Sequence, residues 1–461
     1  MYKRPLSLLL VFITLLFIAS SCKNNPSGND KGEYLEINSW VQSQMERYYF
    51  WNELVPEEVD GVLPPEDFFA SMLEPSDNFS YISDDAQSLL AELNGSSYTA
   101  GFSPAFGRFS GTDDVFIVVE FVYPGSPAEN AGIERGDIIL EINGQGLTID
   151  NYLDLYYDES ETTTYTFGEY DPEQNSVSLG GSTTLTKAEL SLDPVVYTDI
   201  IEVNSQKIGY LFYARFLTGE ENQFIESVDN ALSEFANQGI TELVVDLRYN
   251  PGGRISAAKN LANSIAPSAV TANEEAFIRY NYNAELEQYY IEQEGLDSPN
   301  LVSRFSADPT NLNLERAYFL TTSGSASASE LLIIGLRPYM DVIMIGTPTY
   351  GKFYGSYVLT GENASPPNNY AMVPVTLKYE NANGFSDFRD GLAPDYTVEE
   401  DLFQPKAIGD TTDVLLAKAI QLITGADEPA AKVPSRIPYQ LLDDPIKLRK
   451  GNVLFEDEKL K

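Results

Sequence analysis

The chain alternates strand-like and helix-like segments from about residue 205 to residue 410. The strand-like runs are "KIGYLFYARF", "TELVVDL", "RAYFLTT" and "DVIMIGT", and helical patterns lie between them at 221–237, 255–265 and "ASELLIIGL". Strands separated by helices pair in parallel, because a parallel connection needs a long crossover. This alternation predicts an α/β fold for residues 196–425, with a parallel sheet at its centre.

Three strand ends in this region carry conspicuous residues. "VVDLRYNPGG" ends in Gly252 and Gly253, "TTSGSASASE" places Ser327 at a helix N-terminus, and "GTPTYGKF" contains Lys352. Ligands bind outside the carboxyl ends of the strands of parallel α/β sheets, so these three ends mark a candidate site. Taken singly, the same residues are also compatible with a tight turn, a helix cap and a surface lysine.

"GTPTYGKF" also fits the P-loop pattern G-x-x-x-x-G-K, which would bind a nucleotide. A P-loop requires Ser or Thr after the lysine and then a helix, whereas Phe353 follows here. We therefore predict no nucleotide binding. The formal net charge of −40 also repels phosphate backbones, so we predict no nucleic-acid binding.

The chain contains no histidine and one cysteine. Ser-His-Asp triads, Cys-His dyads and His-ligated zinc sites are thereby excluded, and we predict no metal and no cofactor. A Ser-Lys dyad needs no histidine, but its amine must be neutral and therefore desolvated. The neighbours of Lys352 in sequence are uncharged, which favours Ser327 and Lys352 as such a dyad.

Residues 97–195 differ from the α/β region in containing short β-rich runs and frequent turns. "GSPAENAGIERGDIILEINGQ" resembles the PDZ domains of bacterial proteases, where "SPAxxAGxxxGDxIxxxNG" recurs. The resemblance implies capture of a partner's C-terminal peptide by strand addition, with its carboxylate on backbone N–H groups near Gly101 and Phe102. The alternative is a PDZ-like domain that only covers the site.

"DLRYNPGG", "SASASE" and "GTPTYGK" occur in this order, preceded by "GSPAENAGIERGDII" and followed by "GLAPDYTV". As an ordered set over residues 97–400, these motifs resemble the tail-specific, or C-terminal processing, peptidases. The resemblance implies a crotonase-like or ClpP-like core with an inserted PDZ-like domain. Separately, apolar residues at three- and four-residue spacing in "EINSWVQSQMERYYFWNEL" predict a small helical N-terminal region at residues 33–96.

The resemblance assigns roles to the site residues. It implies that Ser327 is the nucleophile and Lys352 the general base. The oxyanion hole would consist of the N–H of Ala328 and that of one glycine of the Gly252/Gly253 pair, with Gly252 slightly favoured.

Two further positions, Glu330 and Thr349, match the family and are expected to support the site. One position departs from it. Many members carry "GKGxVQ", where the glutamine orients the lysine, whereas this chain reads "GKFYGS" with Ser356 at the glutamine position. We expect a hydroxyl to hold Lys352 here, with shorter reach.

The first 22 residues have a basic start, an apolar stretch and a small-residue run that ends in Cys22. This layout resembles a bacterial lipoprotein signal peptide, although Ala19 stands where leucine is usual. It implies cleavage before Cys22 and acylation of that cysteine; the alternatives are an uncleaved anchor or ordinary secretion. The composition of residues 23–32 predicts a flexible tether. Residues 426–461 are expected to form a Pro- and charge-rich tail.

The sequence thus predicts a lipid-anchored serine endopeptidase on the extracytoplasmic side of a bacterial membrane. Its expected partners are protein or peptide substrates, recognised through their C-termini by the PDZ-like domain. One alternative is a catalytically degenerate lipoprotein that binds peptides without cutting them. A second, suggested by 29 Tyr and 24 Phe, is a carbohydrate-related surface lipoprotein.

Overall fold

A parallel sheet forms the centre of the protein. The computed structural model describes residues 28–425, 437–444 and 455–456. In this sheet β10 is antiparallel to β11, and all other neighbours are parallel. The predicted α/β fold is confirmed. In sheet order, the strands are β10 (Val195–Val203), β11 (Gln206–Tyr213), β12 (Glu242–Asp246), β15 (Arg316–Thr321), β16 (Asp341–Gly346) and β21 (Tyr396–Thr397).

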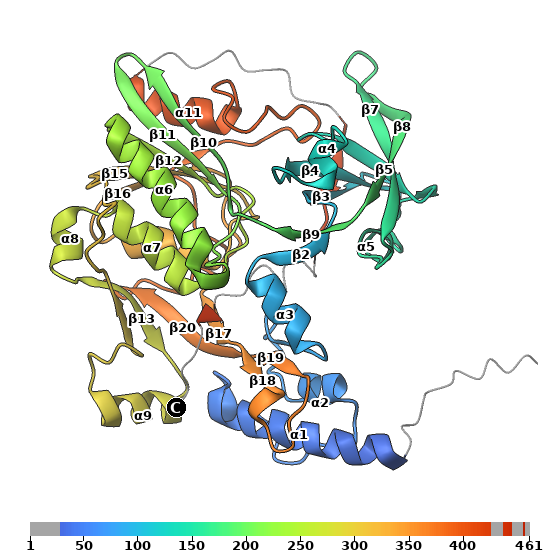
Figure 1. Cartoon of the computed structure of the whole chain (residues 1–461), viewed down its shortest axis with the longest axis vertical. Coiled ribbons are helices and arrows are strands. Elements are labelled where there is room, and N and C mark those ends of the chain that lie inside the picture. The colour runs from blue at the N-terminus through green and yellow to red at the C-terminus, as the bar shows by residue number, and fades with distance from the viewer. Residues whose placement is uncertain (1–27, 426–436, 445–454, 457–461) are drawn as a thin grey trace, which may run out of the picture.

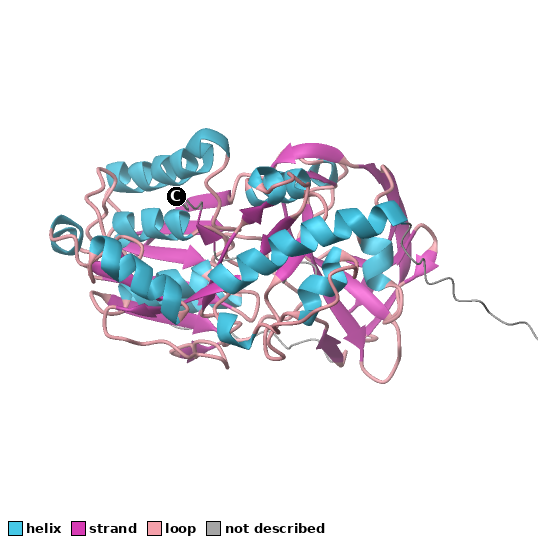
Figure 2. Cartoon of the chain, turned by 90° about the horizontal axis from the view of Figure 1, so that it is seen from below, coloured by secondary structure: helices cyan, strands magenta, loops and turns pink. Residues whose placement is uncertain are grey.

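Helices cover both faces of this sheet. α6 (Gln223–Gln238), α7 (Ile255–Ile265) and α10 (Ala328–Leu336) pack on one face, and α11 (Val414–Thr424) packs on the other. Successive residues of a strand point to opposite faces, so Val245 joins the first core and Val244 the second. α7 and α10 have the predicted bounds. Figure 2 shows helices lying against the strands.

A second sheet and the N-terminal region lie beside this core, and the N-terminal region is less helical than predicted. β1 (Tyr81–Ser83) pairs with β19 (Ala371–Val373), almost 300 residues later, and no local pattern shows that contact. The second sheet contains β14 (Val302–Arg304), β13 (Ala276–Asn281), β20 (Val375–Asn381), β17 (Tyr354–Tyr357) and β23 (Phe455–Glu456). A three-stranded sheet contains β1 (Tyr81–Ser83), β19 (Ala371–Val373) and β18 (Leu359–Thr360). The remaining α-helices here are α1 (Gly28–Tyr48), α2 (Pro65–Ser71), α3 (Ala86–Leu93), α8 (Ser268–Ala272) and α9 (Ala284–Glu294), and short 3₁₀ turns occur at 52–54, 220–222 and 361–363.

The PDZ-like region is a separate β-rich layer, at the upper right of Figure 1. The paired strands β2 (Ser96–Thr99) and β9 (Ala188–Ser191) connect it to the rest of the chain. Its sheet runs β22 (Tyr439–Leu441), β3 (Phe102–Phe109), β4 (Val115–Val122), β5 (Ile138–Ile142), β7 (Thr162–Asp171) and β8 (Ser176–Thr186), with β6 (Gln145–Gly146) on β5; its helices are α4 (Pro127–Asn130) and α5 (Tyr152–Tyr156).

The predicted C-terminal tail contains structure. Two of its short strands, β22 and β23, complete sheets built from distant parts of the chain. Three-residue and two-residue strands are too short for a periodicity to reveal them. In the three described ranges, no helix has the length and apolarity that crossing a bilayer requires.

Candidate active site

Ser327 lies at the sharp turn between β15 and α10. It is fully buried, and its backbone has φ +59° and ψ −110°, a strained conformation for a residue with a side chain. Its Oγ has no hydrogen-bond partner in the part of the chain that the structure describes. A buried hydroxyl without a partner and a strained backbone are both typical of a nucleophile held ready for a substrate.

The serines on either side of Ser327 fasten this turn to the loop after β12. Ser325 Oγ donates to the carbonyl of Leu247 at 2.7 Å, and Ser329 Oγ donates to the carbonyl of Asn250 at 2.9 Å. The alternation therefore has a structural reason. Two serines hold the two strand ends together, and the middle one faces the site.

The glycine pair lies directly against Ser327. A Cβ on Gly252 would come within 2.7 Å of Ser327 Cβ and 3.0 Å of the Ala328 nitrogen, so only glycine fits. The Gly252 N–H donates to Asn250 Oδ1 at 2.9 Å. The Gly253 N–H has no acceptor among the described residues. Of the two glycine amides, that of Gly252 is thus engaged by the Asn250 side chain and that of Gly253 is not.

Lys352 follows β16 and is 2% exposed. Burial lowers the pKa of its amine to about 7, although the charges of Asp77 and Glu330 partly oppose this shift. Its Nζ lies 4.8 Å from the centroid of the Phe79 ring. Asp77 and Phe79 belong to the loop between α2 and β1, so the N-terminal region covers the lysine. At pH 7 about half of the molecules with an amine of this pKa carry it in the neutral form that accepts a proton.

Glu330 joins the two halves of the site. Its fully buried carboxylate accepts the backbone N–H groups of Ser327 at 2.7 Å, Gly351 at 2.6 Å and Lys352 at 2.9 Å, together with the Thr349 hydroxyl at 2.6 Å. Burial raises the pKa of Glu330 to about 7, and these four hydrogen bonds pull it back. One carboxylate thus sets the spacing between the serine and lysine backbones.

Tyr379 is a second link between these two residues, and no sequence motif marks it. Its hydroxyl lies 2.7 Å from the carbonyl oxygen of Lys352 and 3.1 Å from that of Ser327, and it can donate to either. It lies in β20, where an apolar strand pattern marks it only as a core residue. Asp77 and Phe79 were missed because their loop, between α2 and β1, is distant from the site in the sequence.

The remaining residues predicted from the sequence are Thr349, Ser356, Gly101, Phe102 and Cys22. Thr349 Oγ1 also accepts the Leu392 N–H at 2.7 Å, which ties "GLAPDYTV" to the site. Ser356 is buried in β17. Gly101 and Phe102 lie at the start of β3, where the Gly101 N–H donates to Thr99 Oγ1 at 3.2 Å. Cys22 lies outside the described residues.

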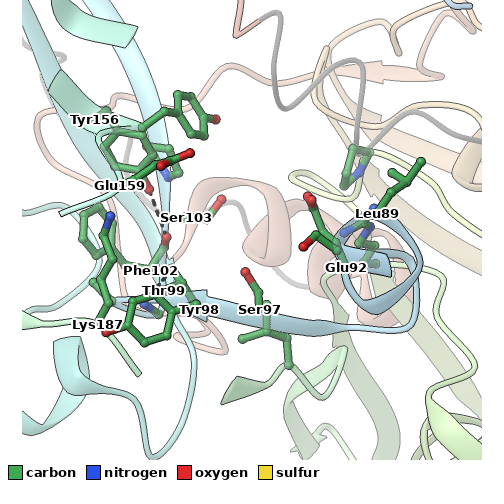
Figure 3. Close-up of a pocket in the computed structure, with 18 of the residues that line it drawn as sticks. Leu89, Glu92, Ser97, Tyr98, Thr99, Phe102, Ser103, Tyr156, Glu159 and Lys187 are labelled. Atoms are coloured by element: carbon green, nitrogen blue, oxygen red, sulfur yellow. Dashed lines mark hydrogen bonds between the residues drawn. The ribbon is translucent and has the colours of Figure 1, made fainter. Parts of the chain in front are cut away.

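Gly101 and Phe102 line a cavity of about 850 Å³ between the PDZ-like region and the core. Figure 3 shows Phe102, Ser103 and Tyr156 on one side of it and Leu89 and Glu92 of α3 on the other. Pro251, which precedes the glycine pair, also lines it. The head of the PDZ-like sheet thus faces the same open space as Pro251, the residue that precedes Gly252.

Three family models match the chain: peptidase family S41 at residues 207–398, the peptidase S41 N-terminal domain at 36–81 and a PDZ domain at 118–164. The chain belongs to peptidase family S41. The S41 match covers all three motifs that form the site, and S41 peptidases of this type are serine peptidases.

Known S41 proteins agree with this membership. A carboxyl-terminal-processing protease of Picosynechococcus sp. is 27% identical over 308 residues, and one of Synechocystis sp. is 28% identical over 312. These matches cover 65% of this chain in both cases, and 65% and 63% of the relatives, so this S41 chain spans less than two thirds of their length. A crystal structure of a Bacteroides fragilis protein assigned to the S41 proteases is 28% identical with a TM-score of 0.69, covering 84% of this chain and 98% of that one.

Proposed function

We propose that this S41 chain is a serine endopeptidase whose nucleophile is Ser327 and whose general base is Lys352. One observation carries the proposal. The Glu330 carboxylate binds the backbone N–H of both residues, the Ser327 Oγ has no hydrogen-bond partner among the described residues, and the Lys352 amine is buried with a lowered pKa. A neutral amine next to a serine hydroxyl is what covalent catalysis without histidine requires.

The proposed reaction has two steps. Neutral Lys352 takes the proton of Ser327 Oγ as the oxygen attacks the scissile carbonyl, and the N–H groups of Gly253 and Ala328 stabilise the oxyanion. The lysine ammonium then protonates the leaving amine, which leaves an acyl-enzyme on Ser327. A water that loses its proton to Lys352 then attacks the ester, and the lysine ammonium returns a proton to Ser327 Oγ as the carboxylic acid product leaves.

Labelling with a fluorophosphonate probe tests this function. In protein lacking residues 1–22, we expect the wild type to be labelled and the Ser327→Ala and Lys352→Ala variants to remain unlabelled. An unlabelled wild type, also in the presence of C-terminal peptides, would favour the alternative of a degenerate peptide-binding lipoprotein.

The pH dependence of peptide cleavage follows from the lysine. Below its pKa of about 7 the amine is protonated and cannot accept the serine proton, so kcat/KM should rise as pH increases through about 7. The Glu330 charge raises the lysine pKa, so Glu330→Gln should shift the midpoint to lower pH as well as slow the reaction. A pH-rate profile between pH 5 and 9 that is flat in both proteins would exclude Lys352 as the base.

The substrate class and location follow from the rest of the chain. We propose extracytoplasmic proteins as substrates, delivered through their C-termini by the PDZ-like domain, whose head opens onto the cavity beside Pro251. We also propose that Cys22 carries the lipid anchor, on the basis of the sequence that precedes it.

The lipid anchor is testable by fractionation. In a bacterial host, Cys22→Ser should move the protein from the membrane fraction to the soluble fraction or leave its leader uncleaved, because the acylated residue is lost. Incorporation of labelled palmitate into the wild type, and its absence from Cys22→Ser, is the direct measurement. Equal labelling of both proteins would place any lipid elsewhere.

A further inference from the structure

The chain's own C-terminal segment lies on the edge strand of the PDZ-like sheet. β22 pairs with β3 in antiparallel register, with Tyr439 opposite Phe109 and Leu441 opposite Gly107. Two backbone bonds frame the pairing, from Ser110 N to Pro438 O and from Leu442 N to Phe106 O, both 2.9 Å. Strand addition at this kind of edge is how PDZ domains hold peptides, so part of the groove has an occupant from the same chain.

Side chains hold the segment from the other wall of the groove. The Phe106 ring of β3 contacts Tyr152 and Tyr156 of α5 at centroid distances of 5.0 and 5.4 Å, and Leu442 packs on this cluster. The Tyr152 hydroxyl donates to the carbonyl of Asp443 at 3.1 Å. Leu442 thus lies in the space between β3 and α5 that an incoming peptide side chain would need.

The segment also has the direction of a peptide ligand. It runs antiparallel to β3, so its later residues approach Phe102 and the cavity at the head of the sheet. Asp444 is buried there, and its Oδ2 accepts the Tyr157 hydroxyl at 2.6 Å. A C-terminal peptide added to β3 with its carboxylate toward Gly101 and Phe102 would run the same way.

Residues 455–456 of the predicted tail lie in the second sheet. β23 pairs in parallel with β17, with Phe455 opposite Ser356. β17 begins two residues after Lys352, and Figure 1 shows β23, in dark red, beside it. Two described pieces of the predicted tail, residues 437–444 and 455–456, therefore contact the PDZ-like sheet and the strand that follows the proposed base, respectively.

We propose that residues 437–444 are an intramolecular occupant of the PDZ-like groove, which a substrate's C-terminal peptide must displace. This proposal rests on the proposed function only in taking the displacing ligand to be a substrate peptide. Because the segment competes for the groove within the same chain, the apparent affinity for a peptide equals the intrinsic affinity multiplied by the fraction of molecules in which the groove is open. The groove is thereby closed to weak ligands.

The test compares two adjacent leucines in the full chain with Ser327→Ala, so that no peptide is cleaved. Leu442 packs in the groove, whereas Leu441 is 50% exposed. The probe is a fluorescent synthetic peptide with the sequence of residues 437–444, followed by anisotropy. We expect Leu442→Asp to bind this probe at least about tenfold more tightly than the parent, and Leu441→Asp to bind it like the parent.

Each other outcome overturns the proposal. Equal affinity in all three proteins means that the segment does not occupy the groove in solution, and no binding to Leu442→Asp means that the groove does not hold this sequence. A probe carrying the Leu442→Asp change must bind weakly to every variant. The binding assay needs no catalysis. If the protein that retains Ser327 fails to be labelled by the fluorophosphonate, that result counts against the proposed peptidase function alone and leaves the proposed occupant of the groove untouched.

Discussion

Replacing Lys352 by methionine is expected to lower kcat/KM for a peptide substrate by about 10⁴-fold or more, close to the effect of Ser327→Ala. Methionine fills much of the same buried space but accepts no proton, so the serine hydroxyl loses its base. Removal of either member of a nucleophile–base pair has effects of this size, and they are not additive. The double variant should therefore be no slower than either single one.

Unfolding does not account for this expected loss. A buried amine destabilises the fold through desolvation, so methionine at position 352 should leave stability unchanged or raise it. Lys352→Arg should be as inactive as Lys352→Met, because a guanidinium stays protonated. Lys207→Met is the matched control, since Lys207 is partly exposed and 3.6 Å from Glu202, and it should remain within twofold of wild type. A Lys352→Met protein within tenfold of wild type would place the base elsewhere.

The sequence was sufficient to predict those parts of the fold that depend on residues close together in the chain. The alternation of strands and helices predicted the parallel sheet, and the bounds of α7 and α10 followed from their apolar patterns. The segment "GTPTYGKF" fits the P-loop pattern, but two of its backbone N–H groups already have a partner in the protein. The Gly351 and Lys352 N–H groups bind the Glu330 carboxylate, an anion supplied by the protein itself.

The remaining features depend on contacts that are distant in the sequence. Tyr379 and Asp77 reach the site through β20 and through the N-terminal loop, and neither has a motif around it. The sequence alone does not distinguish Gly252 from Gly253. In the structure, the Asn250 side chain accepts the N–H of Gly252 and not that of Gly253. The strand β22 has no pattern of its own, because its partner β3 determines its conformation.

The strand end that carries the glycine pair is anchored by a buried charge network around Arg248, which is 1% exposed. Its guanidinium binds Asp246 through Nε at 3.0 Å and Asp413 through Nη1 and Nη2 at 3.0 and 2.9 Å. Nη1 also donates to Glu400 at 3.2 Å, and Glu400 pairs with Arg135 of the PDZ-like region. Asp413 in turn caps α11 by accepting the N–H groups of two of its first residues.

Arg248→Met is expected to lower the free energy of unfolding by about 3–5 kcal/mol, because it leaves the Asp246 and Asp413 carboxylates buried without their main counter-charge. Arg304→Met is the control: its partner Asp297 is 2.9 Å away but largely exposed, and such pairs contribute about 1 kcal/mol or less. Urea unfolding followed by far-ultraviolet circular dichroism measures both. Since the network borders the loop of Gly252 and Gly253, Arg248→Met should also reduce fluorophosphonate labelling at urea concentrations where Arg304→Met remains fully labelled. Equal unfolding midpoints for the two variants would show that the carboxylates are stabilised without the arginine.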